Sequence, residues 1–376
     1  MSPFALRCWV EVSRRQIAEN FHAVRALVGA GVEVMPVIKA DAYRHGAVEV
    51  ARVLVKQGAA WLGVASVEEG ATLRQAGVSA RILVMSDFIP GDRSFLVEYD
   101  LTPALHSLDS VREWDEMARK TGLPLRYHLK IDSGFGRLGT RAAAAEIAGA
   151  VLNARRARLE GLMTHFASAA DYASPQNDEQ TACFHAVAAH LREAGIRPPH
   201  VHLSGTIPIA YGRREAWGNM VRPGHAIYGY VSPARGPAPR NLLSVKPALA
   251  WKASVLLVKE VPEGAPIGYG AIFRAPRPMR VAVLSAGYAD GVPHRLSNRG
   301  SVVAKGKLAA ILGSVSMDVT TIDASGCPDL QPGDAVTLLG TEGGVTLDAQ
   351  QIARTAGTIS YSILCGISAR VRRVYL

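Results

Sequence analysis

The sequence of 376 residues has no apolar run that approaches the roughly 18–20 residues needed to span a bilayer. Its first residues, MSPFALRCWVEVS, also lack the basic segment followed by an apolar one that marks a secretory signal. These two absences favour a cytoplasmic protein with no membrane partner.

Cysteine is scarce. The four cysteines lie far apart and form no Cys-x-x-Cys pair, so the sequence indicates neither a disulfide framework nor a zinc site. We therefore expect no metal and a reducing compartment.

Runs of basic charge are missing as well, although Lys and Arg number 42 against 32 Asp and Glu, a formal net charge of +10. The basic residues are scattered, and the densest cluster is RVRRVYL at 370–376. A nucleic-acid-binding face needs concentrated basic charge. The excess fits attraction to small anions better, so we expect no nucleic-acid partner.

What is present divides into two textures. Up to about residue 230, short apolar runs alternate with Ala-rich helical stretches, as in a (β/α)8 barrel of the TIM type. The clearest helical patterns are 45–57, 67–77, 108–121, 141–154 and 176–194. The eight runs predicted as strands are 34–39, 61–66, 80–86, 101–107, 125–132, 159–166, 200–205 and 219–224.

Chemistry in such barrels gathers where the strands end. The C-terminal ends of the eight predicted strands carry polar side chains: Lys39, Ser66, Ser86, His106, Asp132, His165, Ser204 and Arg222. After about residue 240 the helical periodicity nearly vanishes, and short β-rich runs lie between turn signals. We therefore predict a barrel over 1–240 that binds a cofactor and an all-β domain over 241–376.

Lys39 is the first candidate for chemistry, because it ends the apolar strand VIK (37–39). One interpretation is a lysine whose aliphatic stem lies on the strand end while its ammonium reaches water. The other is a desolvated lysine with a lowered pKa, suited to forming an imine with a carbonyl group. The residue types alone leave both open.

The residues that follow resemble a known family. VIKADAYRHG (37–46) resembles the lysine motif of the bacterial, pyridoxal-phosphate-dependent alanine racemases. Further motifs of that family follow in its order along nearly the whole chain. They are LKIDSGFGRLG (129–139), GLMTHF (161–166), NMVRPGHAIYG (219–229), IGYGAIF (267–273), GYADGVPHRLSN (287–298), SVSMD (314–318) and ISYSILCGISARVRRVY (359–375).

The resemblance implies an alanine racemase that interconverts L-alanine and D-alanine by a two-base mechanism on a pyridoxal phosphate aldimine. Removing a proton from one face of the α-carbon and returning it to the other face needs two bases. The resemblance makes Lys39 the base for D-alanine and Tyr269 the base for L-alanine. It also implies a homodimer with shared active sites, in which Tyr269 and Met317 serve the partner's barrel, and a supply of D-alanine for peptidoglycan.

The remaining site residues come from the same resemblance. Arg222 faces the pyridine nitrogen of the cofactor and donates a hydrogen bond without giving up its proton. His165 links Arg222 to Tyr269, Arg137 and Met317 bind the substrate carboxylate, and Tyr288 lies at the entrance. Lys130 matches a lysine that is often carbamylated in the family. The resemblance assigns binding of the cofactor's phosphate to Tyr43, Thr206, Tyr361 and the main chain of Gly224 and His225.

Four positions depart from the family pattern. Arg44 replaces a glycine, Gly205 an asparagine and His225 an aliphatic residue, and Ser314 stands where a basic residue is common. None of them removes a group that the two-base mechanism needs. Arg44 adds charge near the cofactor, and Gly205 and Ser314 change the surroundings of the substrate.

Four alternatives remain at this stage. A racemase of broader substrate range differs only in its pocket. A decarboxylase of similar build commonly has an acidic residue where this chain has Arg222. A non-catalytic pyridoxal phosphate carrier usually lacks the β domain and Tyr269. A nucleic-acid-binding protein would show strongly salt-dependent binding to DNA.

Overall fold

The computed structural model describes residues 5–376 of the chain. They divide into two compact units. We call Ile17–Ala42 with Ala47–Lys246 the barrel unit. The strand unit consists of residues 5–16, the short segment Tyr43–Gly46 and Pro247–Leu376. The first strand of the chain therefore belongs to the same unit as its last third. A single division near residue 240 assigns this strand to the other domain.

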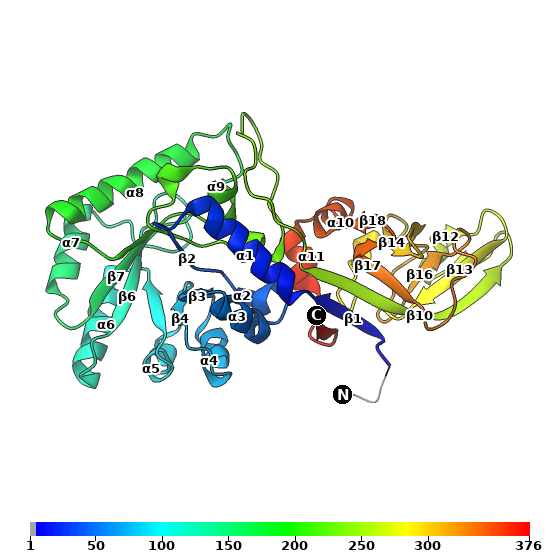
Figure 1. The fold of residues 1–376 in the computed structure, drawn as a ribbon, viewed down its shortest axis with the longest axis horizontal. Helices are drawn as coiled ribbons and strands as arrows, with labels where there is room; N and C mark the ends of the chain where they lie inside the picture. The colour runs from blue at the N-terminus through cyan, green and yellow to red at the C-terminus, as the bar shows by residue number, and fades with distance from the viewer. Residues whose placement is uncertain (1–4) are drawn as a thin grey trace. The chain divides into compact units, whose positions relative to one another are not determined.

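The barrel unit contains a strand at each of the eight predicted places, and helices alternate with these strands (Figure 1). Six of them form one parallel sheet in chain order, and β2 pairs with β9 in parallel. Main-chain hydrogen bonds close the ring, from Ile38 to Gly63 at 2.8 Å and from Asn219 to Val201 at 3.0 Å. The strands are β2 (Glu33–Val34), β3 (Trp61–Val64), β4 (Arg81–Val84), β5 (Thr102–Leu105), β6 (Arg126–Lys130), β7 (Arg158–Met163), β8 (His200–His202) and β9 (Met220–Val221). The predicted (β/α)8 barrel is confirmed.

Apolar side chains fill part of the ring because the strands of a parallel barrel are buried on both faces. One buried cluster takes a side chain from each of six places around the ring: Met35, Trp61, Leu83, Ala104, Met163 and Met220. The interior is thus a packed core rather than a channel, as the fold requires.

Helices follow the strands of the barrel unit, and several have recognisable caps. Helix α6 (Leu108–Thr121) begins after Ser107, whose hydroxyl accepts the Ser110 N–H, and ends at Gly122 with a φ of 71°. The others are α1 (Arg14–Val28), α3 (Ala47–Lys56), α4 (Val67–Gln75), α5 (Arg93–Glu98), α7 (Ala144–Asn153), α8 (Gln176–Glu193) and α9 (Thr206–Ala210). Helices α1, α5 and α9 are not among the clear helical patterns of the sequence.

The strand unit is built around the long strand β10 (Leu249–Val261), whose first residues alternate between buried and half-buried positions. It pairs antiparallel with β1 (Cys8–Val12), β13 (Met279–Leu284) and β17 (Ala335–Glu342). On its other side β1 pairs in parallel with β19 (Arg372–Tyr375).

Shorter strands complete the strand unit: β11 (Pro266–Ile267), β12 (Phe273–Arg274), β14 (Ser301–Ala304), β15 (Lys307–Ala310), β16 (Thr320–Asp323) and β18 (Val345–Leu347). The unit also contains two helices, α10 (Ala349–Ala356) and α11 (Ser360–Gly366), which an all-β description leaves out. Helix α10 begins with a capping box, in which Asp348 accepts the Gln351 N–H. Over residues 5–376, no helix is both long and apolar enough to cross a membrane.

Gly161 on β7 is the glycine on which the barrel interior depends most directly. A Cβ atom placed on it would lie 2.3 Å from Nδ1 of His128, which is fully buried. We expect Gly161→Ala to lower the free energy of unfolding by about 1–3 kcal/mol, the usual cost of overpacking a core. Urea unfolding followed by circular dichroism measures it.

Gly149→Ala is the matched control for that substitution. Gly149 lies within α7, and a Cβ atom there meets nothing within 4 Å. This change should be neutral or stabilising by up to about 1 kcal/mol, because alanine is the better helix former. Equal effects of the two substitutions would contradict the tight contact at His128.

Candidate functional site

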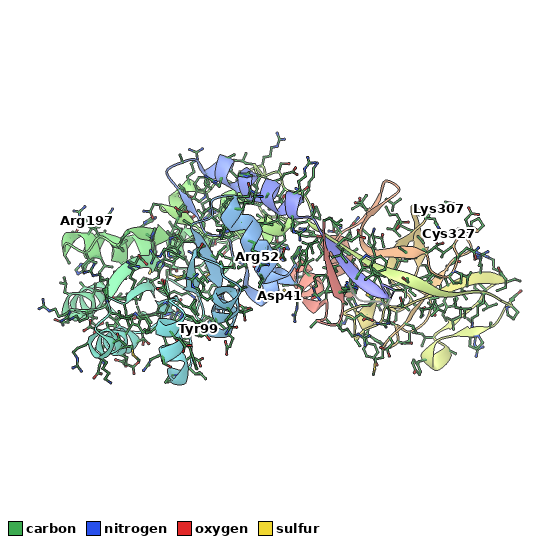
Figure 2. The ribbon with its side chains drawn as sticks, turned by 60° about the horizontal axis from the view of Figure 1, so that its bottom comes forward. Asp41, Arg52, Tyr99, Arg197, Lys307 and Cys327 are labelled. Carbon is green, nitrogen blue, oxygen red and sulfur yellow. The ribbon has the colours of Figure 1, made fainter. Side chains whose placement is uncertain are left out.

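Lys39 lies at the rim of the barrel, directly after the segment whose main chain bonds to Gly63. Its side chain is exposed, so the protein alone does not bury the amine. The lysine opens a short helical turn, α2 (Lys39–Tyr43), that is left-handed: Ala40, Asp41 and Ala42 have φ of 53–54° and ψ of 48–49°. Asp41 is labelled in Figure 2.

The left-handed turn is costly, since a residue with a Cβ atom loses roughly 1–2 kcal/mol in this conformation. Two carboxylates stabilise it. Glu69 accepts the N–H groups of Ala40 at 2.6 Å and Ala65 at 2.7 Å, and Asp41 accepts the Ala47 N–H at 2.7 Å. Strain held in place by its surroundings is typical of functional sites.

Arg44 continues the left-handed conformation with a φ of 66°. Glycine, the residue that the family pattern implies at this position, adopts a positive φ at no steric cost. The Arg44 side chain lies in the strand unit, where its Nε donates to the Cys365 carbonyl at 3.4 Å.

Arg222 is almost completely buried in the barrel, and its guanidinium is held by protein acceptors. Nη1 donates to Nδ1 of His202 at 2.8 Å and to its carbonyl at 2.7 Å. Nη2 donates to the carbonyls of Thr164 at 2.6 Å and Leu203 at 2.9 Å. Burial lowers the pKa of Arg222 to about 9, so the group stays cationic at neutral pH.

Nε is the one nitrogen of the Arg222 guanidinium with no hydrogen-bond partner among residues 5–376. Four bonds fix the plane of the group and leave this N–H as a single directed donor. A directed donor of this kind suits a ligand atom that accepts its hydrogen bond. A neutral ring nitrogen is an acceptor of the required kind.

His165 borders Arg222 at the end of β7. Its Nδ1 lies 3.4 Å from Nη2 of Arg222, a long contact. Burial and, to a smaller extent, the surrounding cations Arg222, Lys130, Lys39 and Arg137 together lower the pKa of His165 to about 3. The imidazole is therefore neutral at physiological pH.

Residues 204–206 and 222–226 lie side by side in the barrel unit. The Arg222 N–H donates to the Ser204 carbonyl at 2.9 Å, and the Ala226 N–H donates to Oγ1 of Thr206 at 3.2 Å. Within residues 5–376 the main-chain N–H groups of Gly205, Thr206 and Gly224 have no acceptor. Unpaired N–H groups at the starts of helical turns suit an anion such as a phosphate.

Gly205 itself is not required by the packing. A Cβ atom there would meet Cε1 of His165 at 3.5 Å, an ordinary contact. Its departure from the family pattern therefore removes a polar side chain without a steric reason in this structure.

Lys130 and Arg137 provide two cations of different kinds. Lys130 is buried, and burial together with Arg137 and Arg222 lowers the pKa of its amine to about 8. Arg137 is exposed and lies over the Phe135 ring at 4.2 Å. No hydrogen bond occupies the Arg137 guanidinium among residues 5–376, so its paired donors suit a carboxylate.

Asp132 fixes the loop that carries Arg137. Its Oδ1 accepts the N–H groups of Gly134, Phe135 and Gly136 between 2.8 and 3.1 Å. Burial alone would raise the pKa of Asp132, but these hydrogen bonds and one from Arg141 outweigh it and lower the pKa to about 2.

Tyr43 and Tyr361 lie together in the strand unit, with ring centroids 5.9 Å apart. Burial raises the pKa of Tyr43 far above its ordinary value, and the neighbouring phenol of Tyr361 raises it further. Tyr43 therefore acts as a neutral hydroxyl at physiological pH.

Tyr269 lies in the turn between β11 and β12, flanked by Gly268 and Gly270 with φ of 73° and 68°. Its side chain is 76% exposed. Both glycines adopt conformations that other residues avoid, so the sequence Gly-Tyr-Gly is what this turn requires. The turn presents the phenol outward from the strand unit.

Met317 and Tyr288 lie on adjoining loops of the strand unit. The Tyr288 N–H donates to the Ser316 carbonyl and the Ala289 N–H to the Met317 carbonyl, both at 3.0 Å. A Cβ atom on Gly287 would lie 2.3 Å from the Met317 carbonyl oxygen, so the loops touch only because Gly287 has none.

Asp290 anchors these loops. Its buried carboxylate accepts hydrogen bonds from Arg370 at 2.7 and 2.9 Å, from Arg7 at 3.0 Å and from the Gly287 N–H at 2.9 Å. Burial alone would raise the pKa of Asp290, but these contacts outweigh it and lower the pKa. Ser314 has a polar neighbour, Nε2 of His294 at 3.1 Å.

The predicted site residues therefore fall into two sets, one in each unit. The barrel unit brings together Lys130, His165, Thr206, Arg222 and Gly224, with Lys39, Arg137 and His225 in the same unit. The strand unit holds Tyr43, Tyr269, Met317 and Tyr361. Sequence reasoning missed His202, which bonds directly to Arg222, and Asp290. The only sequence signal for His202 was the alternation of residues along β8, which turns His200 and His202 to the same face.

A cavity of about 810 Å³ lies elsewhere in the barrel unit, lined by residues such as Phe21, Arg25, Val34, His200 and Asn219. None of the predicted site residues lines it. A well-formed pocket is the default place to expect a bound ligand. Here the unpaired donors and the shifted pKa values point to the carboxyl ends of the strands instead.

The fold defines a class, enzymes made of a (β/α)8 barrel followed by a strand-rich domain. Two family models match the chain, the alanine racemase N-terminal domain over residues 12–233 and the C-terminal domain over 248–375. The chain belongs to the alanine racemase family and is a pyridoxal-phosphate-dependent racemase.

Individual relatives are similar to this chain over nearly its full length. The alanine racemase of Halothermothrix orenii is 39% identical over 368 residues, covering 98% of this chain and 96% of the relative. The crystal structure of alanine racemase from D-cycloserine-producing Streptomyces lavendulae has a TM-score of 0.92 at 33% identity, covering 99% and 98%. That of the Bartonella henselae enzyme, with covalently bound pyridoxal phosphate, has a TM-score of 0.87 at 27% identity, covering 99% and 100%.

The Asp290 anchor leads to a test of stability. Asp290→Asn removes the charge that two arginines share, and we expect a loss of about 1–3 kcal/mol, because both arginines are partly exposed. A carboxyl with a lowered pKa stabilises fully above its ordinary value. The difference from wild type should hold between pH 5 and 8 and shrink below about pH 4.

Asp318→Asn is the control, measured in the same urea titrations. Asp318 pairs with Arg370 at 2.8 Å but its side chain is 56% exposed. Exposed pairs contribute roughly 0–1 kcal/mol. A loss for Asp318→Asn as large as that for Asp290→Asn would contradict the role of the buried carboxylate.

Proposed function

We propose that the protein interconverts L-alanine and D-alanine by a two-base mechanism and so supplies D-alanine for peptidoglycan in the cytoplasm. The observation that carries the proposal is the Arg222 guanidinium, which is fixed by four short hydrogen bonds and keeps one donor, Nε, for a ring nitrogen. An arginine there favours racemisation over chemistry that needs a protonated ring.

The donor groups in the barrel unit fit pyridoxal phosphate. Gly205, Thr206 and Gly224 offer unpaired main-chain N–H groups for an anion, and the Thr206 hydroxyl lies beside them. Residues that would hold the phosphate are Thr206, Gly224 and His225, together with the Tyr43 and Tyr361 hydroxyls. The Lys39 amine would hold the carbonyl carbon. When bound, the cofactor supplies an electron sink that lets the α-carbon of alanine give up its proton.

Lys39 and Tyr269 move the proton. Lys39 takes it from D-alanine and returns it when D-alanine forms, and Tyr269 does the same for L-alanine on the opposite face. Each is one half of a general acid–base pair, and neither reaches both faces. His165 links Tyr269 to Arg222, a role that its neutral imidazole and its contact with Arg222 support.

Arg137 and Met317 hold the substrate carboxylate. The free guanidinium of Arg137 supports this role, as does the hydrogen-bonded Asp132 loop that limits its motion. Lys130 carries a carbamate: a buried amine with a pKa near 8 is partly neutral at physiological pH and reacts with carbon dioxide as a neutral amine. The resulting anion orients Arg137.

Two chains form the working enzyme. The barrel unit binds the cofactor, and the strand unit contributes the second base to the barrel of the partner in a homodimer. The outward turn that presents Tyr269 supports this assembly.

The role of Tyr269 is tested by Tyr269→Phe. Racemisation should fall by at least about 100-fold in both directions, the scale of a lost general base. In deuterium oxide, the variant should still exchange the α-proton of D-alanine through Lys39 and should no longer exchange that of L-alanine. Proton NMR with a chiral assay follows both.

Tyr99→Phe is the control for that experiment, since the hydroxyl of Tyr99, labelled in Figure 2, accepts a hydrogen bond from Nε2 of Gln75 at 3.1 Å and is none of the predicted site groups. It should behave as wild type. Full racemisation by Tyr269→Phe would point instead to a protein that carries the cofactor without using this tyrosine.

Shared sites are tested by mixing defects. Lys39→Ala and Tyr269→Phe chains are each inactive alone. When they are co-expressed, about half of the dimers are mixed and one site in each mixed dimer is intact, so about a quarter of wild-type activity should return. Co-expression of Lys39→Ala with the double variant should restore none. No recovery in the first mixture would mean that each site lies within one chain.

A further inference from the structure

A line of buried polar groups extends from Arg222 through the barrel interior. Nη1 of Arg222 lies 2.8 Å from Nδ1 of His202, and Nε2 of His202 lies 2.8 Å from Nδ1 of His128. Nε2 of His128 faces Oε2 of Glu160 at 3.9 Å. Both histidines are completely buried.

The order of donors along this line is fixed at one end. An arginine has only donors, so Nδ1 of His202 must accept and its proton must sit on Nε2. That proton then points at Nδ1 of His128, which must accept in turn, and the His128 proton sits on Nε2, facing Glu160. Each ring therefore has one allowed tautomer, and neither ring carries a second proton.

The surroundings keep both rings neutral. Burial lowers the pKa values of His128 and His202 well below the ordinary range, and the neighbouring histidines and the cations Arg81 and Arg222 lower them further. The charged groups that face the line are Arg222 at one end and, at the other end, Glu160 with Arg81 and Arg126.

The barrel is shaped to hold the two rings. Gly161, opposite His128 on the next strand, has no Cβ atom and so leaves the space that the His128 ring occupies. The edge of His128 packs against Trp61 at 5.2 Å, and His200 stacks on it at 5.9 Å with an interplanar angle of 24°. His200 has no hydrogen bond in the line.

We propose that His202, His128 and Glu160 are positioning residues that orient Arg222 and keep its proton away from the ring nitrogen of the cofactor. The inference rests on the proposed role of Arg222. The lone pair of His202 Nδ1 faces the guanidinium, and the protons of both rings point toward the carboxylate of Glu160. The aligned dipoles stabilise the cationic form of Arg222 and fix the direction in which Nε donates.

Weakening this line should let the ring nitrogen gain proton character. The measurable consequence is a side reaction: alanine leaves as pyruvate, water supplies the carbonyl oxygen, and the amino group stays on the cofactor as pyridoxamine phosphate. The ratio of this event to racemisation reports on Arg222 directly, and a change in overall stability does not move it.

The first experiment reads the tautomers without any turnover. Enzyme labelled with ¹⁵N-histidine is studied by long-range proton–nitrogen NMR between pH 6 and 9, with signals assigned through the His128 and His202 variants. Both rings should be neutral with the proton on Nε2 throughout. A proton on Nδ1 of His202, or a doubly protonated ring, would overturn the proposal.

The second experiment uses holoenzyme variants. His128→Leu removes the acceptor for His202, and Glu160→Gln removes the negative charge at the far end with little change in side-chain size. Pyruvate release per racemisation should rise about ten-fold, the lower range of effects seen for outer partners of a bound group. The ¹⁵N shift of ring-labelled cofactor should move toward the protonated value in both variants.

His200→Phe is the matched control, because it preserves an aromatic ring against His128 outside the hydrogen-bonded line. It should leave both readouts at wild-type values. Should His128→Leu fail to fold, Glu160→Gln decides the matter alone.

Arg222→Gln separates the two levels of the proposal. If it changes both readouts while His128→Leu and Glu160→Gln do not, the line has no positioning role. If Arg222→Gln leaves both readouts unchanged, the proposed role of Arg222 fails, and the inference drawn from it fails too.

Discussion

A guanidinium buried inside a barrel is the constraint on which the rest of the site depends. Arg222 keeps its charge away from water only because carbonyls from three neighbouring residues and a histidine accept its protons. Those acceptors come from the ends of β7 and β8. The charge of the site is therefore stabilised only when these barrel strands pair in the correct register. A slip of one residue would turn His202 outward and leave a buried cation unpaired.

The same need for acceptors explains the strained turn after Lys39. Glu69 accepts two main-chain N–H groups, one at the left-handed Ala40 and one at the end of β3. A helix of the barrel thus holds the turn that sets the direction of the lysine. Rigidity of this kind is what a base needs if it is to reach one face of a substrate and not the other.

The sequence was enough to predict the barrel, because eight apolar runs that end on polar side chains and alternate with helical patterns are compatible with few folds. Helix α6 matches its predicted bounds, since Ser107 and Gly122 are strong signals at its two ends. Helix α1 was missed, although Ile17, Phe21, Val24 and Val28 share one face. The helices α10 and α11 were missed because a β-rich texture surrounds them.

In the site, the resemblance to the family supplied the names of residues, but it did not supply their partners. No local sequence pattern encodes these partners, because they come from strands that are far apart in the chain. Examples are the hydrogen bonds that leave Nε of Arg222 free, the burial of the Lys130 amine and the line from His202 to Glu160. Membership of strand β1 in the strand unit is of the same kind, because its pairing partners are β10 and β19.

That pairing of β1 sets the order in which a growing chain can be completed. Val10 lies between Trp251 and Arg373 in the sheet, so the first strand made has no partner until most of the chain has been translated. At roughly 5–20 residues per second, about 240 residues of synthesis keep it waiting for tens of seconds. The barrel residues emerge in the meantime, and the strand unit closes only when the last few residues leave the ribosome.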